Sequence, residues 1–201
     1  EETTHMHAVS GDCSITGSEV VSFQPLPADI GRLDTAGTYY YYLDEDVTLT
    51  STMEIRDGVI FNLCLNCNVL KVADRGSVIS VFRGGELNLC DCCGHDEPHY
   101  FNTADPSALN GAPWTLTEQT TGDNITAVTG GVITGGKGHI SGTSQVTYGG
   151  GVYNAGELAI VNSKIAANDA LYYGGVYNRG ALYVEGTKLM GNNAEFYGGA
   201  I

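Results

Sequence analysis

Apolar positions recur with a fixed period near the end of the chain. The phrase Gly-Gly-Val-Tyr-Asn at Gly150 returns at Gly174, and Gly-Gly-Ala-Ile begins at Gly198, so the period is 24 residues. Within each repeat, apolar residues alternate with polar or small ones around Leu158 and Leu182, which is the side-chain period of a β-strand. Because one such unit cannot bury its apolar face alone, the repeats predict a solenoid in which each unit stacks on the next.

The content of the repeat favours strands over helices. Glycine pairs interrupt the chain, and β-branched and tyrosine residues dominate between them. We therefore predict an all-β fold, a right-handed parallel β-helix with coils of about 20–26 residues and one long loop excursion. Stacked strands would lie roughly 4.8 Å apart.

Two earlier segments match each other 26 residues apart. The stretch from Phe61 to Cys67 corresponds to the stretch from Leu87 to Cys93, which predicts neighbouring coils in register. The alternation then lapses over residues 94–123, where we expect the loop insertion. Residues 1–30 are predicted to form an irregular N-terminal leader or cap. Residues 31–201 are predicted to form the β-helix, with regular repeats over 148–201 that we expect to continue beyond Ile201.

Polar and aromatic residues also recur at equivalent positions of the repeat. The asparagines are Asn154 with Asn178, and Asn168 with Asn192. Stacked asparagines can hydrogen-bond from coil to coil, so we predict asparagine ladders. The aromatic residues are Tyr172 and Tyr173, aligned with Phe196 and Tyr197. We expect one of these two aromatic columns in the core and the other on the surface.

Six cysteines are the sharpest local signal of chemistry. The predicted register places Cys64 beside Cys90 and Cys67 beside Cys93 at roughly 4.8 Å, within the disulfide range of about 4.4–6.8 Å. Cys13 and Cys92 would remain, and they could pair if the leader folds back. Two alternatives stay open: stacked reduced thiols, or a zinc site. The zinc ligands would come from Cys64, Cys67, Cys90, Cys92, Cys93 and His95.

Three further motifs each have a functional and a structural interpretation. His95, Asp96 and His99 could hold a divalent cation or form a solvated polar loop, and the acidic run 44–46 could bind calcium or form a charged turn. Trp114 and Tyr100 could form an aromatic platform for a sugar, or Trp114 could anchor its own loop. Tyr173 and Tyr197 are further candidate ligand contacts. We predict no cofactor, with calcium or zinc as the open alternatives.

The acidic composition argues against nucleic acids and anionic membranes as binding partners. The net charge is −14 with only nine Lys and Arg, so no basic stripe exists to neutralise nucleic-acid phosphates. The same deficit disfavours an anionic membrane surface. No run of eighteen apolar residues occurs, so this segment is not expected to insert into a membrane.

Several phrases together resemble a family of large secreted or surface-anchored β-helix proteins of gut Firmicutes. They are His5-Met6-His7 with Gly11-Asp12-Cys13, Leu63-Cys64-Leu65-Asn66, Leu89-Cys90-Asp91-Cys92, and the coils from Gly150. The coils are also similar to polymorphic outer-membrane-protein repeats, with Gly198 to Ile201 as the Gly-Gly-Ala-Ile mark, and to pectate-lyase-like β-helices. The resemblance implies an extracellular or cell-surface location and an adhesin-like role.

Three functions remain open. The sequence favours a non-catalytic secreted or cell-surface scaffold, an adhesin that binds host or plant glycans, mucin or a surface protein. The alternatives are a polysaccharide lyase or glycoside hydrolase, by fold analogy alone, and a purely structural stalk. Acidic residues are few in the regular repeats, which leaves an enzyme the weaker interpretation. No catalytic residue is assigned, and the sequence does not indicate an oligomeric state.

Overall fold

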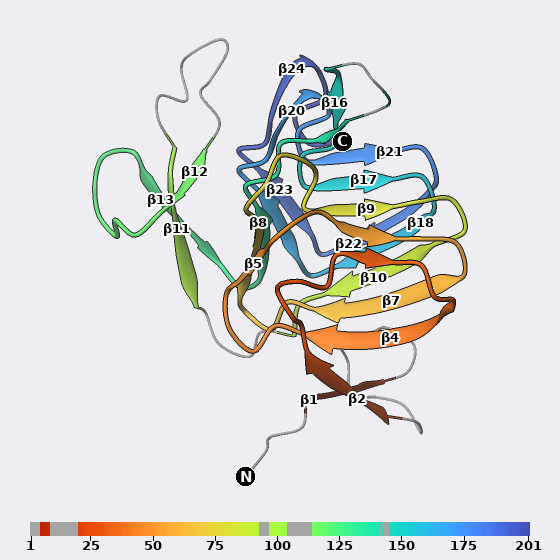
Figure 1. The fold of residues 1–201 in the computed structure, drawn as a ribbon. Coiled ribbons are helices and arrows are strands. Elements are labelled where there is room, and N and C mark those ends of the chain that lie inside the picture. Colours follow the sequence, from red (N-terminus) through yellow and green to blue (C-terminus); the bar gives the residue numbers. More distant parts are fainter. Residues whose placement is uncertain (1–4, 9–19, 93–96, 104–113, 141, 143–144) are drawn as a thin grey trace.

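The computed structural model describes residues 5–8, 20–92, 97–103, 114–140, 142 and 145–201. Within these residues the chain is all-β, with five sheets and no helix (Figure 1). No helix capable of crossing a bilayer is therefore found in this part of the chain. Both the parallel sheets and the lack of helices agree with the coarse fold class expected from the repeats.

Three sheets consist mainly of parallel strands. Sheet I contains β1 (His5–Ala8), β2 (Val20–Pro25), β4 (Gly37–Tyr42), β7 (Val59–Cys64), β10 (Glu86–Cys90), β18 (Glu157–Val161) and β22 (Ala181–Glu185), in that order. Sheet II contains β5 (Val47–Leu49), β8 (Val69–Val72), β14 (Val132–Thr134), β19 (Lys164–Ala166) and β23 (Lys188–Met190). Sheet III contains β3 (Arg32–Leu33), β6 (Met53–Ile55), β9 (Ile79–Val81), β17 (Val152–Asn154) and β21 (Val176–Asn178).

Two smaller sheets complete the described structure. Sheet IV contains β15 (His139–Ile140), β16 (Thr147–Tyr148), β20 (Asp169–Tyr172) and β24 (Asn193–Tyr197). Sheet V is antiparallel and contains β11 (Pro98–Asn102), β12 (Thr115–Thr117) and β13 (Ile125–Thr129).

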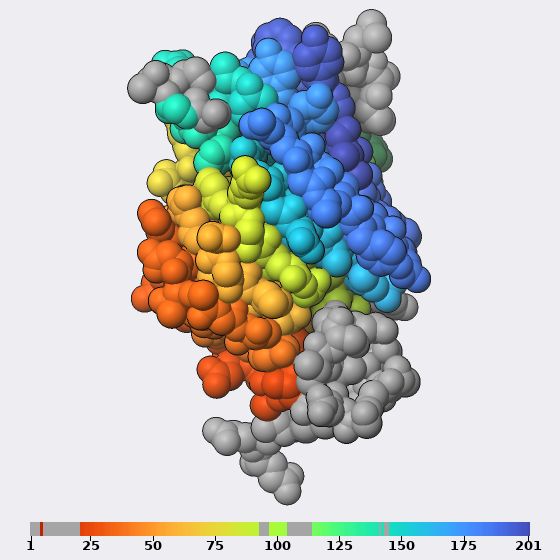
Figure 2. All heavy atoms as spheres, turned by 90° about the vertical axis from the view of Figure 1, so that its right-hand side faces the viewer, coloured from red at the N-terminus to blue at the C-terminus, as the bar shows by residue number. Residues whose placement is uncertain are grey.

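The chain visits sheets I, II and III in turn. It passes from β4 to β5 to β6, and then from β7 to β8 to β9, so each strand pairs in parallel with the strand one circuit later. Figure 2 shows the result as diagonal bands that run from orange through yellow to blue. The yellow band lies directly against the cyan band because β9 pairs with β17 and β10 pairs with β18 across the excursion.

The predicted registers are confirmed. Val152 is the partner of Val176 and Leu158 is the partner of Leu182, which is the 24-residue period. Phe61 is the partner of Leu87, which is the 26-residue match. Periodic sequence therefore fixed the strand pairing, because a slip of one residue would turn each apolar face toward water.

Inward-facing columns from the three sheets form one core. Phe61, Leu87 and Leu158 stack from sheet I, Ile133 and Ile165 from sheet II, and all are almost fully buried. The predicted asparagine ladders are also present. Asn168 Nδ2 donates to Asn192 Oδ1 at 3.0 Å, and Asn154 Nδ2 donates to Asn178 Oδ1 at 2.7 Å. These amides satisfy buried polar groups that would otherwise oppose stacking.

The prediction for the aromatic columns is half wrong. Neither column belongs to the core, since Tyr172 and Tyr173 are partly exposed and Phe196 and Tyr197 are 56% and 63% exposed. The interior at this level is already filled by aliphatic side chains such as Ile165 and Val176. The rings consequently lie on the outside of the stack.

The leader and the excursion hold more structure than their sequences indicated. Within residues 1–30, β1 and β2 form an antiparallel ribbon, and β2 joins sheet I beside β4. The described part of the excursion supplies β11 and β12, which form sheet V with β13 on the left of Figure 1. Fully buried Phe101 packs there with Val69 and Val132 of sheet II. The excursion is therefore docked on the outer side of sheet II.

Asp91 joins the two ends of the excursion, where the chain leaves the stacked strands after β10 and rejoins them at β14. Its carboxylate accepts hydrogen bonds from Cys67 N at 2.9 Å and from Gly131 N at 2.7 Å. Lys164 Nζ lies 3.5 Å from Asp91 Oδ2, and the Asp91 side chain is only 1% exposed. Asp91, which stands where the matching segment 26 residues earlier has Leu65, thus forms a buried polar junction between neighbouring strands.

Candidate functional site

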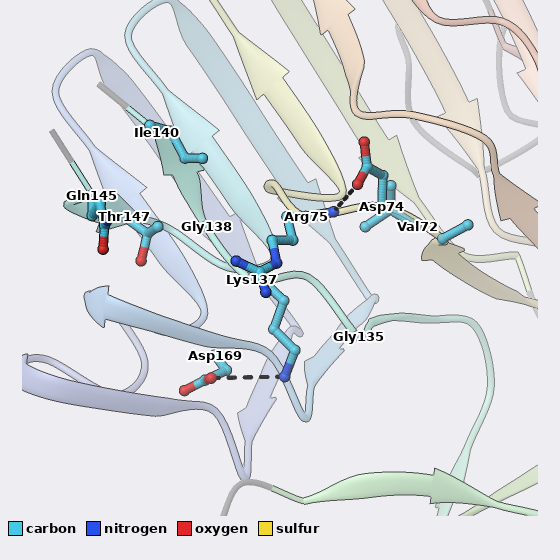
Figure 3. A pocket seen from close by; sticks show the side chains of 11 residues that line it. Val72, Asp74, Arg75, Gly135, Lys137, Gly138, Ile140, Gln145, Thr147 and Asp169 are labelled. Carbon is cyan, nitrogen blue, oxygen red and sulfur yellow. Dashed lines mark hydrogen bonds and ion pairs between the residues drawn. The ribbon is translucent and has the colours of Figure 1, made fainter. Parts of the chain in front are cut away.

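A groove of about 720 Å³ opens beside sheet IV (Figure 3). Arg75 reaches it from the turn between β8 and β9, and Lys137 from the segment between β14 and β15. Thr147 of β16 and Asp169 of β20 line the opposite side. Charged side chains from residues far apart in the sequence thus meet in one hollow.

The charges in this groove are only partly paired. Lys137 Nζ lies 3.7 Å from Asp169 Oδ2, with the two side chains 53% and 33% exposed. Asp169 Oδ1 also accepts from Asn193 Nδ2 at 2.8 Å. Within the described residues no carboxylate pairs with the exposed guanidinium of Arg75. The groove therefore offers a cation to a ligand, although the whole chain is acidic.

A series of aromatic rings runs over the outer side of sheets III and IV. We call this series the aromatic belt. Its members are Phe82, His139, Tyr148, Tyr153, Tyr172, Tyr173, Tyr177, Phe196 and Tyr197, and the centroids of its contacting rings lie 4.3–6.5 Å apart. Arg56 closes one end, with its guanidinium carbon 3.6 Å from the Phe82 ring centroid. The belt combines ring faces with phenol hydroxyls and a cation.

Tyr173 holds an uncommon backbone conformation within the belt. Its φ is 60°, which lies in the left-handed region. The equivalent residue 24 positions earlier is Gly149, and it has the same φ. A bulky residue in this region carries a cost of about 1 kcal/mol or more. The ring of Tyr173 lies 5.2 Å from that of Tyr177. Tyr173 therefore joins the belt from a position where the equivalent residue one repeat earlier is a glycine.

Burial shifts two titrating groups in the belt. It lowers the pKa of His139 below its ordinary value, while Glu54 opposes the shift and Arg56 adds to it. The imidazole is therefore neutral at pH 7. Burial is also the main reason that the pKa of the Tyr177 phenol is raised, against the lowering effect of Arg179. The belt at neutral pH is consequently an uncharged aromatic surface with arginines at its margin.

The four aromatic residues proposed from the sequence separate into two groups. Tyr173 and Tyr197 lie together in the belt, with ring centroids 6.5 Å apart. Trp114 instead packs on Phe101 at 6.3 Å and covers Gly191, where an added Cβ would meet the indole at 2.1 Å. Tyr100 is in β11 of the same sheet V. Trp114 therefore anchors its own segment, which is the second of the two roles predicted for it from the sequence.

The acidic turn and His99 meet in a second groove. Asp44, Glu45, Asp46 and Glu97 line it together with His99. His99 Nε2 donates to Cys67 O at 2.6 Å, and Asp46 Oδ1 accepts from Val69 N at 2.7 Å. These contacts give both residues a structural role. His95 and Asp96, the other predicted cation ligands, lie outside the described residues.

The cysteines differ from two of the predicted pairings, Cys64–Cys90 and Cys13–Cys92, because Cys64 and Cys92 contact each other instead. Cys64 and Cys90 are register partners, but Cys90 is disulfide-bonded while Cys64 Sγ lies 3.1 Å from Cys92 Sγ. In-register parallel neighbours point their side chains the same way, which suits a disulfide poorly. Cys67 is disulfide-bonded. Cys13 and Cys93 lie outside the described residues, so the Cys67–Cys93 pairing remains a prediction.

Cys64 and Cys92 form a cluster with a third side chain. His5 Nε2 lies 3.5 Å from Cys92 Sγ, and Cys92 Sγ lies 3.9 Å from Asn66 Oδ1. The contact with Cys92, followed by burial, raises the pKa of the Cys64 thiol. This cluster is separate from the aromatic belt, because it lies at the β1 and β2 end of the stack in Figure 1.

Sequence reasoning overlooked most of the belt and the groove. Tyr153 and Tyr177 are 24 residues apart within the repeat, so the period itself could have revealed that column. Arg75 and Lys137 carry no such signal, because they belong to turns outside the repeat.

Comparison with known proteins adds no family. No protein-family profile matches the chain, and neither a characterised protein nor a solved structure is significantly similar to it.

Proposed function

We propose that the chain winds as a right-handed parallel β-helix that serves as a non-catalytic, carbohydrate-binding scaffold at a cell surface or outside the cell. The cyclic visits to sheets I, II and III and their shared core support the winding. Parallel crossovers in proteins are right-handed in nearly all cases, which supports the handedness. The disulfide-bonded Cys67 and Cys90 fit an oxidising compartment.

The aromatic belt carries the proposal for carbohydrate. A pyranose ring has an apolar face of C–H groups and a rim of hydroxyls, so it suits a tyrosine face beside polar donors. The belt supplies such faces in succession, from Tyr153, which is almost buried, to Tyr197, which is 63% exposed. Tyr173 strengthens the argument, because its strained backbone is retained where glycine would be easier.

The charged groups near the belt support binding rather than bond cleavage. Glu54 is held by Arg56 Nε at 3.1 Å, and Asp169 is held by Lys137 and Asn193. Carboxylates in such contacts hold the neighbouring donors in fixed positions. Thr147 and Asp169 in the groove share strands with Tyr148 and Tyr172 of the belt, so polar hydrogen-bonding groups accompany the ring faces.

The test is binding of the purified chain to mucin glycans and to plant polysaccharides, measured by calorimetry with calcium and with chelator. The key variant is Tyr173→Gly. Relief of backbone strain should offset the lost ring contacts, so we expect its Tm to stay within about 3 °C of the wild type. Loss of one stacking ring should weaken binding roughly 2- to 12-fold, from about 0.5–1.5 kcal/mol per ring.

The matched control is Tyr183→Ala. Tyr183 is 56% exposed on β22 of sheet I, away from the belt, so its loss should leave glycan affinity unchanged. Equal affinity of the Tyr173→Gly variant and the wild type would exclude the belt as the site. Shortened or unsaturated sugars in the reaction mixture would point to an enzyme instead, and absence of binding to every glycan would favour a structural stalk.

A further inference from the structure

Three soft donor atoms converge at the N-terminal end of the stack. They belong to His5 of β1, Cys64 at the end of β7 and Cys92 just after β10. The Sγ atoms of the two cysteines are 3.1 Å apart, His5 Nε2 is 3.5 Å from Cys92 Sγ, and all three donor atoms lie within 4.8 Å of one another. Segments 59 and 28 residues apart along the chain thus place their donors at one point.

The surroundings hold these side chains in place. His5 stacks on Tyr42 with ring centroids 4.4 Å apart and planes only 9° from parallel. Cys64 is fully buried in a small cluster with Phe23 and Cys90 on the outer side of sheet I. Tyr42 and Cys64 are register partners on adjacent strands, so the imidazole stacked on Tyr42 has its donor atom within 4.8 Å of Cys64 Sγ. The donors are therefore positioned by packing rather than by a loop alone.

We propose that His5, Cys64 and Cys92 bind a soft metal ion, with Zn²⁺ as the ion that the donor set fits best. Zinc takes thiolate sulfur at about 2.3 Å and imidazole nitrogen at about 2.0–2.1 Å, which places tetrahedral ligand atoms about 3.5–3.8 Å apart. The observed separations of 3.1 and 3.5 Å lie within about 0.7 Å of these values, and the third pair, within 4.8 Å, would close by at most about 1.3 Å. Each thiol releases its proton to solvent as the metal–sulfur bond forms.

The position of the site gives the ion a structural role. β1 pairs only with β2 among the described strands, and β2 joins sheet I through only two residue pairs with β4. A metal that joins His5 to the ends of β7 and β10 would fasten this ribbon over the outer side of sheet I. Three protein donors come from the described residues, and a tetrahedral ion would take a fourth ligand beyond these. The role does not depend on carbohydrate binding.

The probe is Co²⁺ added to the full chain purified without metal and without reductant, followed by competition with Zn²⁺. We expect thiolate-to-cobalt charge-transfer absorption and intense tetrahedral d–d bands at one equivalent, both removed by Zn²⁺. The Cys64→Ser, Cys92→Ser and His5→Ala variants should each bind Co²⁺ at least tenfold more weakly. The control is His139→Gln, which removes an imidazole from the aromatic belt and should leave the spectrum unchanged.

A second measurement uses the wild-type chain, so its result does not depend on whether the variants fold. Alkylation of wild-type Cys92, the partly exposed thiol of the two, followed by peptide mass spectrometry, should slow at least tenfold when Zn²⁺ is present. Recovery of Cys64 and Cys92 as a disulfide with each other would overturn the proposal, and so would Co²⁺ spectra without charge-transfer absorption. Unchanged alkylation with Zn²⁺ present would overturn it as well. Glycan binding that fails while these spectra appear would refute only the proposed function.

Discussion

Replacing Asp91 with alanine tests how the chain returns from its excursion to the stacked coils. The carboxylate accepts from Cys67 N and from Gly131 N, and both contacts are buried. An orphaned buried N–H costs about 1–3 kcal/mol, so the two orphaned donors in Asp91→Ala should lower the free energy of unfolding by about 2–6 kcal/mol. Urea unfolding should show this loss by circular dichroism.

The same variant should also separate two spectroscopic transitions. Trp114 is the only tryptophan and packs on Phe101 of the excursion, so its fluorescence reports on sheet V docking. Circular dichroism reports on the parallel sheets. Because Gly131 lies two residues after the end of β13, we expect fluorescence to change at lower urea than circular dichroism in the variant, with closer transitions in the wild type.

Lys164→Met is the matched control for Asp91. It removes the ion pair at 3.5 Å and leaves both backbone donors satisfied, so it should cost only about 1–2 kcal/mol. A loss in Lys164→Met as large as in Asp91→Ala would refute the reasoning, because the ion pair and not the backbone contacts would then dominate. A loss below about 1 kcal/mol in Asp91→Ala would refute it too.

Two further outcomes follow from the contacts around His139 and Trp114. Because burial lowers the folded-state pKa of His139, the stability it contributes is complete above the ordinary value near 6.5 and is lost as pH falls through that value. His139→Gln should therefore lose less Tm than the wild type between pH 7.5 and 5.5, and equal losses would contradict this. Gly191→Ala should displace the indole of Trp114 and red-shift its emission, because the added Cβ would lie 2.1 Å from the ring; an unshifted spectrum would show that Trp114 does not cover Gly191.

The stacking register was predictable because it depends on periodic positions. Leu158 and Leu182 are equivalent in the repeat, and the same residues are partners in the sheet. Asn168 and Asn192 could be predicted as a ladder for the same reason, since an amide at a fixed position of each coil meets its own copy. Such inferences need only the period and the alternation of strand side chains.

The outer faces were less predictable, because alternation tells which side chains point outward but not what covers them. The ribbon of β1 and β2 lies over the outer side of sheet I, and sheet V lies over sheet II. His5 and Cys92 are 87 residues apart and approach only through this covering. The Cys64–Cys90 pairing was expected from register alone, whereas the outward thiol of Cys64 meets Cys92 across the end of the strand.

Aligned residues that point outward differ in chemical type from one strand of a sheet to the next, whereas the aligned residues that point inward stay apolar. On sheet III one outward column reads Glu54, Ser80, Tyr153 and Tyr177. An inward column must fill the same interior at every level, so Met53, Ile79, Val152 and Val176 stay apolar. Freedom from that constraint allows aromatic residues to accumulate over the later coils and thiols to gather at the earlier end. The stacked interior therefore fixes where outward side chains lie, while their identity decides what each end of the stack can bind.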